Sequence, residues 1–238
     1  MKGPYGFELN DSCQTCTRRA NGFFCQLPPE ALKDLESIKF VSAYPENALL
    51  FLEKQAPRGI YLLCEGEMKL SVSSSEGKTL ILRLAKPGEV LGLMAVLSGT
   101  PHEVTAEALR PCQVAFIHRD AFLQFLAKHR EAYPIVARQL GASYQTACEQ
   151  LRTVCLSESV EGRLAKFLLE FSARGQQTRQ GTRVKLPLSH QEIGELIGTA
   201  RETVTRTLSE FKSQDLVTIQ GSTLLIRNRP ALEQLVAA

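Results

Sequence analysis

Two short helix patterns on either side of one glycine, near the C-terminal end of the chain, constrain the fold more than any other feature. Ser189 is followed three residues later by Glu192, the spacing of a capping box, and Thr199 is followed in the same way by Glu202. Gly198 lies between the two patterns, where the first helix is expected to end. Apolar residues recur at helical spacing behind each box, at Ile193, Leu196, Ile197, Val204, Leu208 and Phe211. Two capped helices around a glycine predict a helix-turn-helix.

A hairpin is expected after the second helix, because the apolar runs Leu216–Ile219 and Leu224–Ile226 flank Gly221. This hairpin would form the wing of a winged helix. Upstream of the two helices, Val160–Glu170 has helical spacing, and the polar stretch Arg174–Thr182 is expected to be a loop.

Polar side chains occupy the opposite face of the second helix, within its first two turns: Arg201, Glu202, Thr205 and Arg206. In a recognition helix these turns meet base edges, where Arg can bond guanine bidentately and Glu can accept from cytosine. Short donors and a histidine near the two helix N-termini suit phosphate contacts: Thr199, Thr203, Ser189 and His190. The alternative is a solvated face with pairs such as Glu202–Arg206. The capping boxes, the glycine and the wing together favour recognition of double-stranded DNA.

The charge distribution is compatible with DNA as a partner. Val160–Ala238 contains eleven Lys/Arg and eight Asp/Glu, whereas Met1–Ser159 contains seventeen of each. The whole formal net charge of +3 therefore falls in the C-terminal third, as expected for a domain that faces phosphates. Chance is the alternative, because three charges are few.

Short apolar runs separated by glycines fill residues 41–117. Four of these runs have the length of strands: Ile60–Cys64, Leu70–Val72, Leu80–Leu84 and Val114–Ile117. Ser74–Gly77 falls between two of them and predicts a hairpin turn. Many short strands at this spacing predict an antiparallel β-roll, and hence an α+β chain. Ahead of the roll, Glu30–Ile38 predicts a short amphipathic helix after Pro28 and Pro29.

Two helices are expected after the roll. Asp120 can cap the first, which would end near His129, and the second would run from Pro134 to about Leu156. Apolar residues of the second helix are spaced four and three apart, at Leu140, Tyr144, Ala147, Leu151 and Val154. So narrow a stripe does not suffice to bury a helix in a core, so we expect the seam of a homodimer. Packing on the chain's own roll is the alternative.

Four parts are therefore expected along the chain. Residues 1–27 form a Cys-bearing segment, 28–118 a β-roll sensor domain, 119–157 the dimerisation helix region, and 158–238 a winged helix-turn-helix. This succession resembles the Crp–Fnr superfamily of transcription regulators (catabolite-activator and fumarate–nitrate regulators), over about residues 28–238. The runs Arg201-Glu202-Thr203-Val204-Thr205-Arg206 and Gly162-Arg163-Leu164-Ala165 are similar to that family's recognition helix and to the start of its DNA-binding domain.

The resemblance implies how such a chain would act. It implies a homodimer on an inverted repeat, with contacts from Arg201, Glu202 and Arg206 to TGTGA-like half-sites, and RNA polymerase as a further partner. In the cyclic-nucleotide-binding members a Glu holds the ribose and an Arg-Ser pair holds the phosphate. The corresponding residues in this chain are Leu93, His102 and Glu103. Cyclic AMP is not expected, because a carboxylate repels phosphate and a neutral His cannot replace a bidentate Arg. This stretch is more similar to the oxygen-sensing, Fnr-like branch.

Three of the seven cysteines, Cys13, Cys16 and Cys25, lie close together ahead of the roll, with the spacing C-x2-C-x8-C. The oxygen-sensing members carry three cysteines here, with a shorter second gap, and a fourth from the roll. The resemblance therefore implies a [4Fe–4S] cluster. Cys112 is the expected fourth ligand, although it falls about three residues ahead of the family's position, and Cys64 is expected to be a core residue. Zinc, a thiol–disulfide switch, or another small ligand in the roll remain alternatives.

Other function classes have little support. The four histidines do not form a spacing such as H-E-x-x-H, and the sequence has neither G-x-S-x-G nor a P-loop, so an enzyme is not expected. A regulatory module whose winged helix binds protein is the remaining rival. No apolar run approaches the ~18–20 residues of a membrane span. The N-terminus also lacks the apolar stretch of a signal peptide, so we expect a cytoplasmic protein.

Overall fold

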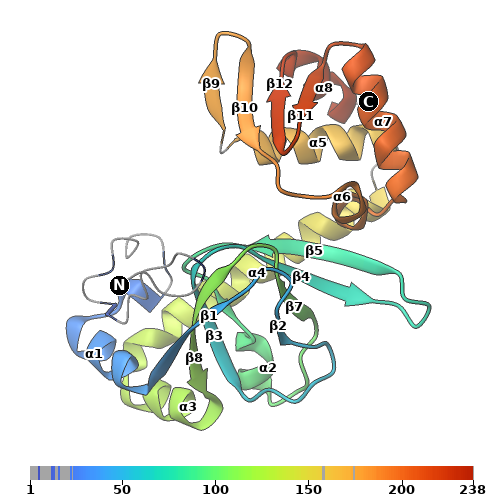
Figure 1. Cartoon of the computed structure of the whole chain (residues 1–238). Coiled ribbons are helices and arrows are strands. Elements are labelled where there is room, and N and C mark those ends of the chain that lie inside the picture. Colours follow the sequence, from blue (N-terminus) through green and yellow to red (C-terminus); the bar gives the residue numbers. More distant parts are fainter. Residues whose placement is uncertain are drawn as a thin grey trace. The chain divides into compact units, whose positions relative to one another are not determined.

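The computed structural model describes residues 5, 12–13, 16, 22, 24–156, 159–173 and 175–237. The chain divides into two compact units, Met1–Ala147 and Cys148–Ala238, and the boundary falls within the long helix α4 (Tyr133–Leu156) (Figure 1). None of the described helices is both long and apolar enough to cross a membrane.

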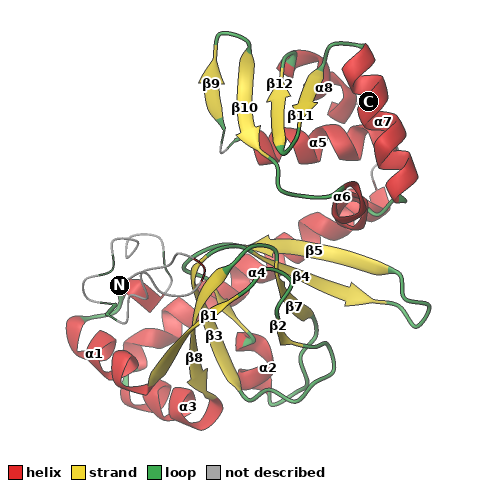
Figure 2. Ribbon diagram, in the orientation of Figure 1, coloured by secondary structure: helices red, strands yellow, loops and turns green. Residues whose placement is uncertain are grey.

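The N-terminal unit contains a β-roll of two antiparallel sheets, as the sequence predicts (Figure 2). One sheet has the strand order β1-β8-β3-β6, and the other has the order β2-β7-β4-β5. The strands are β1 (Lys39–Tyr44), β2 (Leu49–Phe51), β3 (Gly59–Glu65), β4 (Met68–Ser73), β5 (Thr79–Ala85), β6 (Val90–Leu91), β7 (Thr105–Ala108) and β8 (Cys112–His118). The expected turn after β4 is present, and Gly77 there has a φ of +80°, which suits glycine.

Helices cover one side of the roll. They are η3 (Phe24–Gln26), α1 (Pro29–Ile38), α2 (Leu93–Ser98), α3 (Arg119–Lys128) and η4 (Arg130–Ala132), which leads into α4. Pro29 stands in the first turn of α1, which buries Leu32 and Leu35 as predicted. The expectation that Asp120 caps α3 is wrong. His118 has the extended backbone of an N-cap, so Asp120 falls inside the first turn.

The C-terminal unit is a winged helix-turn-helix. Its helices are α5 (Val160–Ser172), α6 (His190–Ile197), α7 (Arg201–Ser213) and α8 (Arg229–Ala237). Its strands are β9 (Gln176–Thr178), β10 (Gly181–Lys185), β11 (Val217–Gln220) and β12 (Thr223–Ile226), in the sheet order β11-β12-β10-β9. The expected loop over Arg174–Thr182 is wrong, because β9 and the start of β10 form a hairpin there. The described residues of β9 are all exposed, so this edge strand has no apolar alternation by which to detect it.

Candidate nucleic-acid interface

The turn between α6 and α7 depends on two glycines. The predicted capping box of α6 is formed: Ser189 Oγ accepts from the Glu192 amide at 3.2 Å, and Glu192 Oε2 accepts from the Ser189 amide at 2.9 Å. Gly198 ends α6 with a φ of +67°, as glycine permits. Gly194, inside α6, was not singled out from the sequence. A Cβ there would lie 2.7 Å from the Thr199 carbonyl oxygen, so glycine lets the turn fold back onto the helix.

The second predicted capping box is absent. The Thr199 amide donates to the Gly194 carbonyl at 2.9 Å, which keeps Thr199 inside the turn. Ala200 is therefore the N-cap of α7, without a side-chain hydrogen bond, and Glu202 is the second helical residue rather than the third. The apolar half of the prediction is correct, because Val204, Leu208 and Phe211 are buried.

The opposite face of α7 presents the predicted contact residues to solvent. Arg201, Glu202, Thr205 and Arg206 are exposed, and Thr203 is partly exposed. Within the part of the chain that the structure describes, the side chains of Glu202 and Arg206 have no hydrogen bond or ion pair, so the alternative Glu202–Arg206 pair is not formed. An acidic and a basic group without protein partners remain available for a ligand.

His190 connects the N-terminus of α6 to α7. Its Nδ1 lies 2.8 Å from Thr205 Oγ1, and that hydroxyl also bonds to the Arg201 carbonyl at 3.0 Å. Burial lowers the pKa of His190, and the charges of Lys212 and Arg201 lower it further. The imidazole is therefore neutral at neutral pH, and His190 positions Thr205 rather than adding positive charge to the surface.

The run Gly162-Arg163-Leu164-Ala165 sets the position of α6. Arg163 Nε donates to the Ile197 carbonyl at 2.8 Å, which satisfies a backbone acceptor at the end of α6. The Gly162 amide donates to Ser159 Oγ, the N-cap of α5, and a Cβ on Gly162 would lie 2.8 Å from the Leu235 carbonyl oxygen. These contacts of α5 help to hold the helix-turn-helix in place.

The predicted seam of α4 is only partly exposed. Tyr144 is 72% exposed and Leu151 is 59% exposed. Leu140 packs against the core of the N-terminal unit, and Val154 Cγ1 would lie 2.8 Å from a Cβ added to Gly198 in the C-terminal unit. Two large apolar side chains of the predicted stripe are thus exposed in the single chain, while other members of the stripe serve the chain's own packing.

Cys13, ahead of the roll, is anchored by α1 and β1. Glu36 of α1 accepts hydrogen bonds from Ser12 Oγ at 3.0 Å and from the Cys13 amide. Lys39 Nζ lies 3.0 Å from Cys13 Sγ and places a positive charge beside the sulfur. Cys13 itself is buried in the same apolar cluster as α1 and α3.

Cys64 shares this neighbourhood, which the sequence did not suggest. Its side chain packs against the apolar cluster that contains Cys13. The pKa of Cys64 is raised to about 12, mainly because the thiol is buried; the thiols of Cys13, Cys25 and Cys16 contribute to the rise, and Lys39 opposes it. Cys64 therefore lies within electrostatic reach of each of the three N-terminal thiols.

Cys112 lies in a different place. It is fully buried with the residues between the two sheets, in a cluster that includes Leu63, Met68 and Val114. Its thiol donates to the carbonyl oxygens of Glu67 and Arg110, at 3.5 and 3.1 Å. Burial raises the pKa of Cys112 to about 11. The expectation that Cys112 joins the three N-terminal cysteines does not agree with this position.

A cavity of about 260 Å³ lies beside the roll, lined mainly by apolar side chains. Among the described residues that line it, Arg83 is the one cation, and it is paired with Glu89. Leu93 and Glu103 also line the cavity, as the sequence comparison with the cyclic-nucleotide-binding pattern placed them. His102 is buried and stacks on Phe51 with ring centroids 3.9 Å apart, and burial lowers its pKa.

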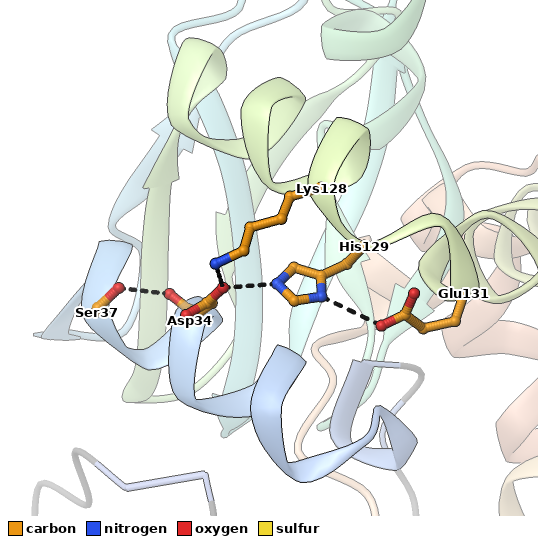
Figure 3. Close-up of polar contacts among 5 residues, drawn as sticks. All are labelled: Asp34, Ser37, Lys128, His129 and Glu131. Carbon is orange, nitrogen blue, oxygen red and sulfur yellow. Dashed lines mark hydrogen bonds and ion pairs between the residues drawn. The ribbon is translucent and has the colours of Figure 1, made fainter.

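A polar cluster joins α1 to the residues that precede α4 (Figure 3). Asp34 of α1 accepts from Lys128 Nζ and lies 2.7 Å from His129 Nε2, while His129 Nδ1 lies 3.2 Å from Glu131. The hydrogen bond with Asp34 is the main cause that raises the pKa of His129, and Lys128 followed by His129 lowers the pKa of Asp34. Helix α1 is thus bonded both to Cys13, through Glu36, and to the C-terminal end of α3, through Asp34.

Comparison with known proteins identifies both units. A Crp-like helix-turn-helix domain matches residues 162–235, and a cyclic nucleotide-binding domain matches residues 41–129. The relatives that match this chain are transcription regulators of the Crp–Fnr family. One relative is the CRP-like cAMP-activated global transcriptional regulator of Mycobacterium tuberculosis, 24% identical over 212 residues, 89% of this chain and 94% of the relative. Another is the cAMP-activated global transcriptional regulator CRP of Salmonella typhimurium, 24% identical over 187 residues, 78% and 89% of the two chains.

Solved structures of Crp–Fnr regulators have the same fold. FixK2 from Bradyrhizobium japonicum matches with a TM-score of 0.73 and 24% identity, over 84% of this chain and 98% of its own. The c-di-GMP-responsive global regulator CLP from Xanthomonas campestris matches with a TM-score of 0.75 and 18% identity, over 84% and 99%. The predicted fold and superfamily are confirmed. The name of CLP gives c-di-GMP as its signal, whereas the names of the two relatives above give cAMP, so the shared fold does not define the signal of this chain.

Proposed function

We propose that this DNA-binding transcription regulator acts as a homodimer on an inverted repeat with TGTGA-like half-sites, and responds to oxygen, nitric oxide or redox state through an N-terminal iron–sulfur cluster. The observation that carries the DNA part is the exposed face of α7, where Glu202 and Arg206 have no partner among the described residues. The family relationship extends the proposal to RNA polymerase as a partner and to the cytoplasm as the place of action.

The exposed side chains of α7 suit a half-site that contains both guanine and cytosine. Arg201 and Arg206 can each present two parallel donors to guanine O6 and N7, and Glu202 can accept from cytosine N4. All three lie in the first two turns of α7, the part of a recognition helix that enters the major groove. Thr199, Thr203 and Ser189 lie near the N-termini of the two helices, where hydroxyl and amide donors suit phosphate oxygens.

The exposed stripe of α4 supports a homodimer. Tyr144 and Leu151 are large apolar side chains that α4 leaves exposed in the single chain. An isologous interface brings the same residues of two copies together, so one apolar stripe suffices for both partners. Two-fold symmetry of the protein then corresponds to an inverted repeat in the DNA.

The thiols of Cys13, Cys16 and Cys25 support the sensory part. Thiolates are the usual ligands of iron–sulfur clusters, and such a cluster would supply a redox-active centre whose loss or oxidation reports oxygen or nitric oxide. Ligand binding would also order the N-terminal segment, because the free energy of binding is coupled to folding. Glu36 holds Cys13 to α1, and Asp34 of the same helix holds His129. A change at the thiols is therefore connected by one helix to the end of α3, which precedes α4.

Anaerobic and air-exposed protein should differ in DNA affinity if this proposal is correct. Protein reconstituted with iron and sulfide would be titrated against a labelled palindromic duplex before and after exposure to oxygen. A coupling of about 1–3 kcal/mol predicts an affinity change of about 5- to 150-fold. A variant with Cys13, Cys16 and Cys25 all replaced by Ala should lose the response. Equal affinity in all four samples would contradict the sensory role, whereas failure of every sample to bind any duplex specifically would contradict the DNA part.

The apolar cavity beside the roll supports a second candidate signal, a small apolar molecule. Its lining suits such a ligand better than a cyclic nucleotide, because Arg83 is already neutralised by Glu89. Leu140 and Tyr144 of α4 line it, so an occupant would touch the helix of the proposed seam. Calorimetric titration with cyclic AMP should show no binding. Binding of cyclic AMP at micromolar concentrations would contradict this view of the pocket.

A further inference from the structure

Cys64 stands at an irregular position of β3. Leu63 pairs with Val114 and Glu65 with Gln113, and the register between β3 and β8 shifts between these two pairs. Cys64 is thus the extra residue of a β-bulge, a feature that commonly re-aims a side chain next to a functional site. It lies on the same face of β3 as Ile60 and Leu62, which pack in the cluster that contains Cys13. The roll therefore directs this thiol toward the N-terminal segment.

The chain that carries Cys25 is held against the same strand. A Cβ on Gly22 would collide with Cys25 Sγ and would lie 3.4 Å from Gly88 Cα, so these three residues are in close contact. The Gly88 amide in turn donates to the Leu63 carbonyl at 2.7 Å, one residue before Cys64. Cys25 and Cys64 are therefore connected through a short chain of direct contacts.

We propose that Cys64 is the fourth thiolate ligand of the iron–sulfur cluster, together with Cys13, Cys16 and Cys25 and in place of Cys112. This inference rests on the proposed cluster and assigns its attachment to the roll. Cys64 would tie the N-terminal segment to the central strand of one sheet. Cys112, on the other side of β3 between the two sheets, keeps its bonds to the Glu67 and Arg110 carbonyls.

A positive charge stands beside the proposed cluster. Lys39, which bonds to Cys13, adds a positive charge beside a centre that four thiolates would make negative. Hydrogen bonds and charges of this kind also set the potential of a cluster.

Within the described part of the chain, no three His, Cys, Asp or Glu side chains are grouped so that they could hold a metal ion.

Single substitutions of the two roll cysteines provide the test. Wild type, Cys64→Ala and Cys112→Ala would be reconstituted anaerobically, and iron content, visible absorption and electron paramagnetic resonance after reduction would be measured. We expect about four irons per chain in wild type and in Cys112→Ala, and loss of the cluster in Cys64→Ala. Cys64→Ser, which keeps the volume of the side chain, should retain native circular dichroism but bind iron less stably against a chelator.

The outcomes separate this inference from the proposed function. A cluster that persists in Cys64→Ala and Cys64→Ser, or one that disappears only in Cys112→Ala, would overturn the role of Cys64 and leave the cluster in place. Wild-type protein without iron, or with stoichiometric zinc, would overturn both the cluster and this inference. If Cys64→Ala loses its native circular dichroism, Cys64→Ser provides the test instead. A cluster in Cys64→Ser that resists the chelator as well as the wild-type cluster does would contradict the assignment of Cys64 as a ligand.

Discussion

Arg206→Ala tests directly whether α7 reads bases. The side chain is exposed and has no hydrogen bond or ion pair within the described part of the chain, so its removal deletes no contact of the folded protein. The free energy of unfolding should therefore change by no more than about 0.5 kcal/mol. Loss of a bidentate contact to guanine costs about 1–3 kcal/mol, or about 5- to 150-fold in affinity at one half-site. With two independent half-sites, a homodimer on a full inverted repeat should lose about 2–6 kcal/mol.

Fluorescence anisotropy with a panel of duplexes would measure this loss. The panel contains the preferred inverted repeat and versions with one base pair changed at the same position of both half-sites. For one of these positions, Arg206→Ala and wild type should bind the changed duplex almost equally, because the discriminating contact is already lost. The control is Arg229→Ala. Arg229 is also exposed, but it lies on α8 and pairs with Glu233, so its loss should not alter specificity.

Salt dependence distinguishes a base contact from a phosphate contact. If Arg206 touches only phosphate, its loss should weaken binding equally on every duplex and lower the slope of log affinity against log salt by about one per contact. That result would refute base reading by Arg206. It would leave Arg201 and Glu202 as the candidates for specificity.

Three further changes test other parts of the structure. Leu151→Glu should give monomers in sedimentation and weaken binding to the inverted repeat, because like charges would face each other across a symmetric seam; a dimeric variant would reject the seam. Gly198→Ala and Gly221→Ala should each lower the free energy of unfolding, measured with denaturant, by about 1–2 kcal/mol, because both glycines have a positive φ. The loss should be larger for Gly198→Ala, because its new methyl group meets Val154 of α4 whereas that of Gly221→Ala meets no atom. His129→Gln should flatten the loss of stability above pH 6.5. The stabilisation that protonated His129 gains from Asp34 is complete below the ordinary pKa of 6.5 and is lost as the pH rises through the raised pKa of His129. A variant with the same pH profile of stability as wild type would contradict a role for the Asp34–His129 pair.

Periodicity and turn residues predicted the elements that bury an apolar face. The strands of the roll either alternate apolar and polar residues or are apolar throughout, and α7 repeats Val204, Leu208 and Phe211 at helical spacing. The residues that become buried can therefore be predicted from the sequence pattern. β9 was missed because an exposed edge strand needs no apolar side chain. The second capping box was wrong because Thr199 matches the capping pattern, yet its amide is used by the turn, which moves the N-cap to Ala200.

Contacts between segments that are far apart in the sequence could not be predicted from the sequence pattern. Cys64 and Cys112 both lie in apolar strands, and only the register of β3 and β8 decides which one faces the N-terminal segment. Gly194 offered a usable signal, since a glycine inside a short helix is costly unless a close approach requires it. The bond from Arg163 to the end of α6 had no such signal, because it joins positions 34 residues apart.

Helix α1 is the element through which these separate observations can act together. Glu36 and Asp34 are two residues apart, yet the first holds the Cys13 backbone and the second holds His129 at the entrance to α4. Helix α1 also buries Leu32 and Leu35 in the apolar cluster that contains Cys13. We therefore expect a rearrangement at the thiols to be transmitted through α1 to the bond between Asp34 and His129. On this view the Asp34–His129 pair lies between the proposed sensor and the proposed seam, and weakening that pair should reduce the response without removing the cluster.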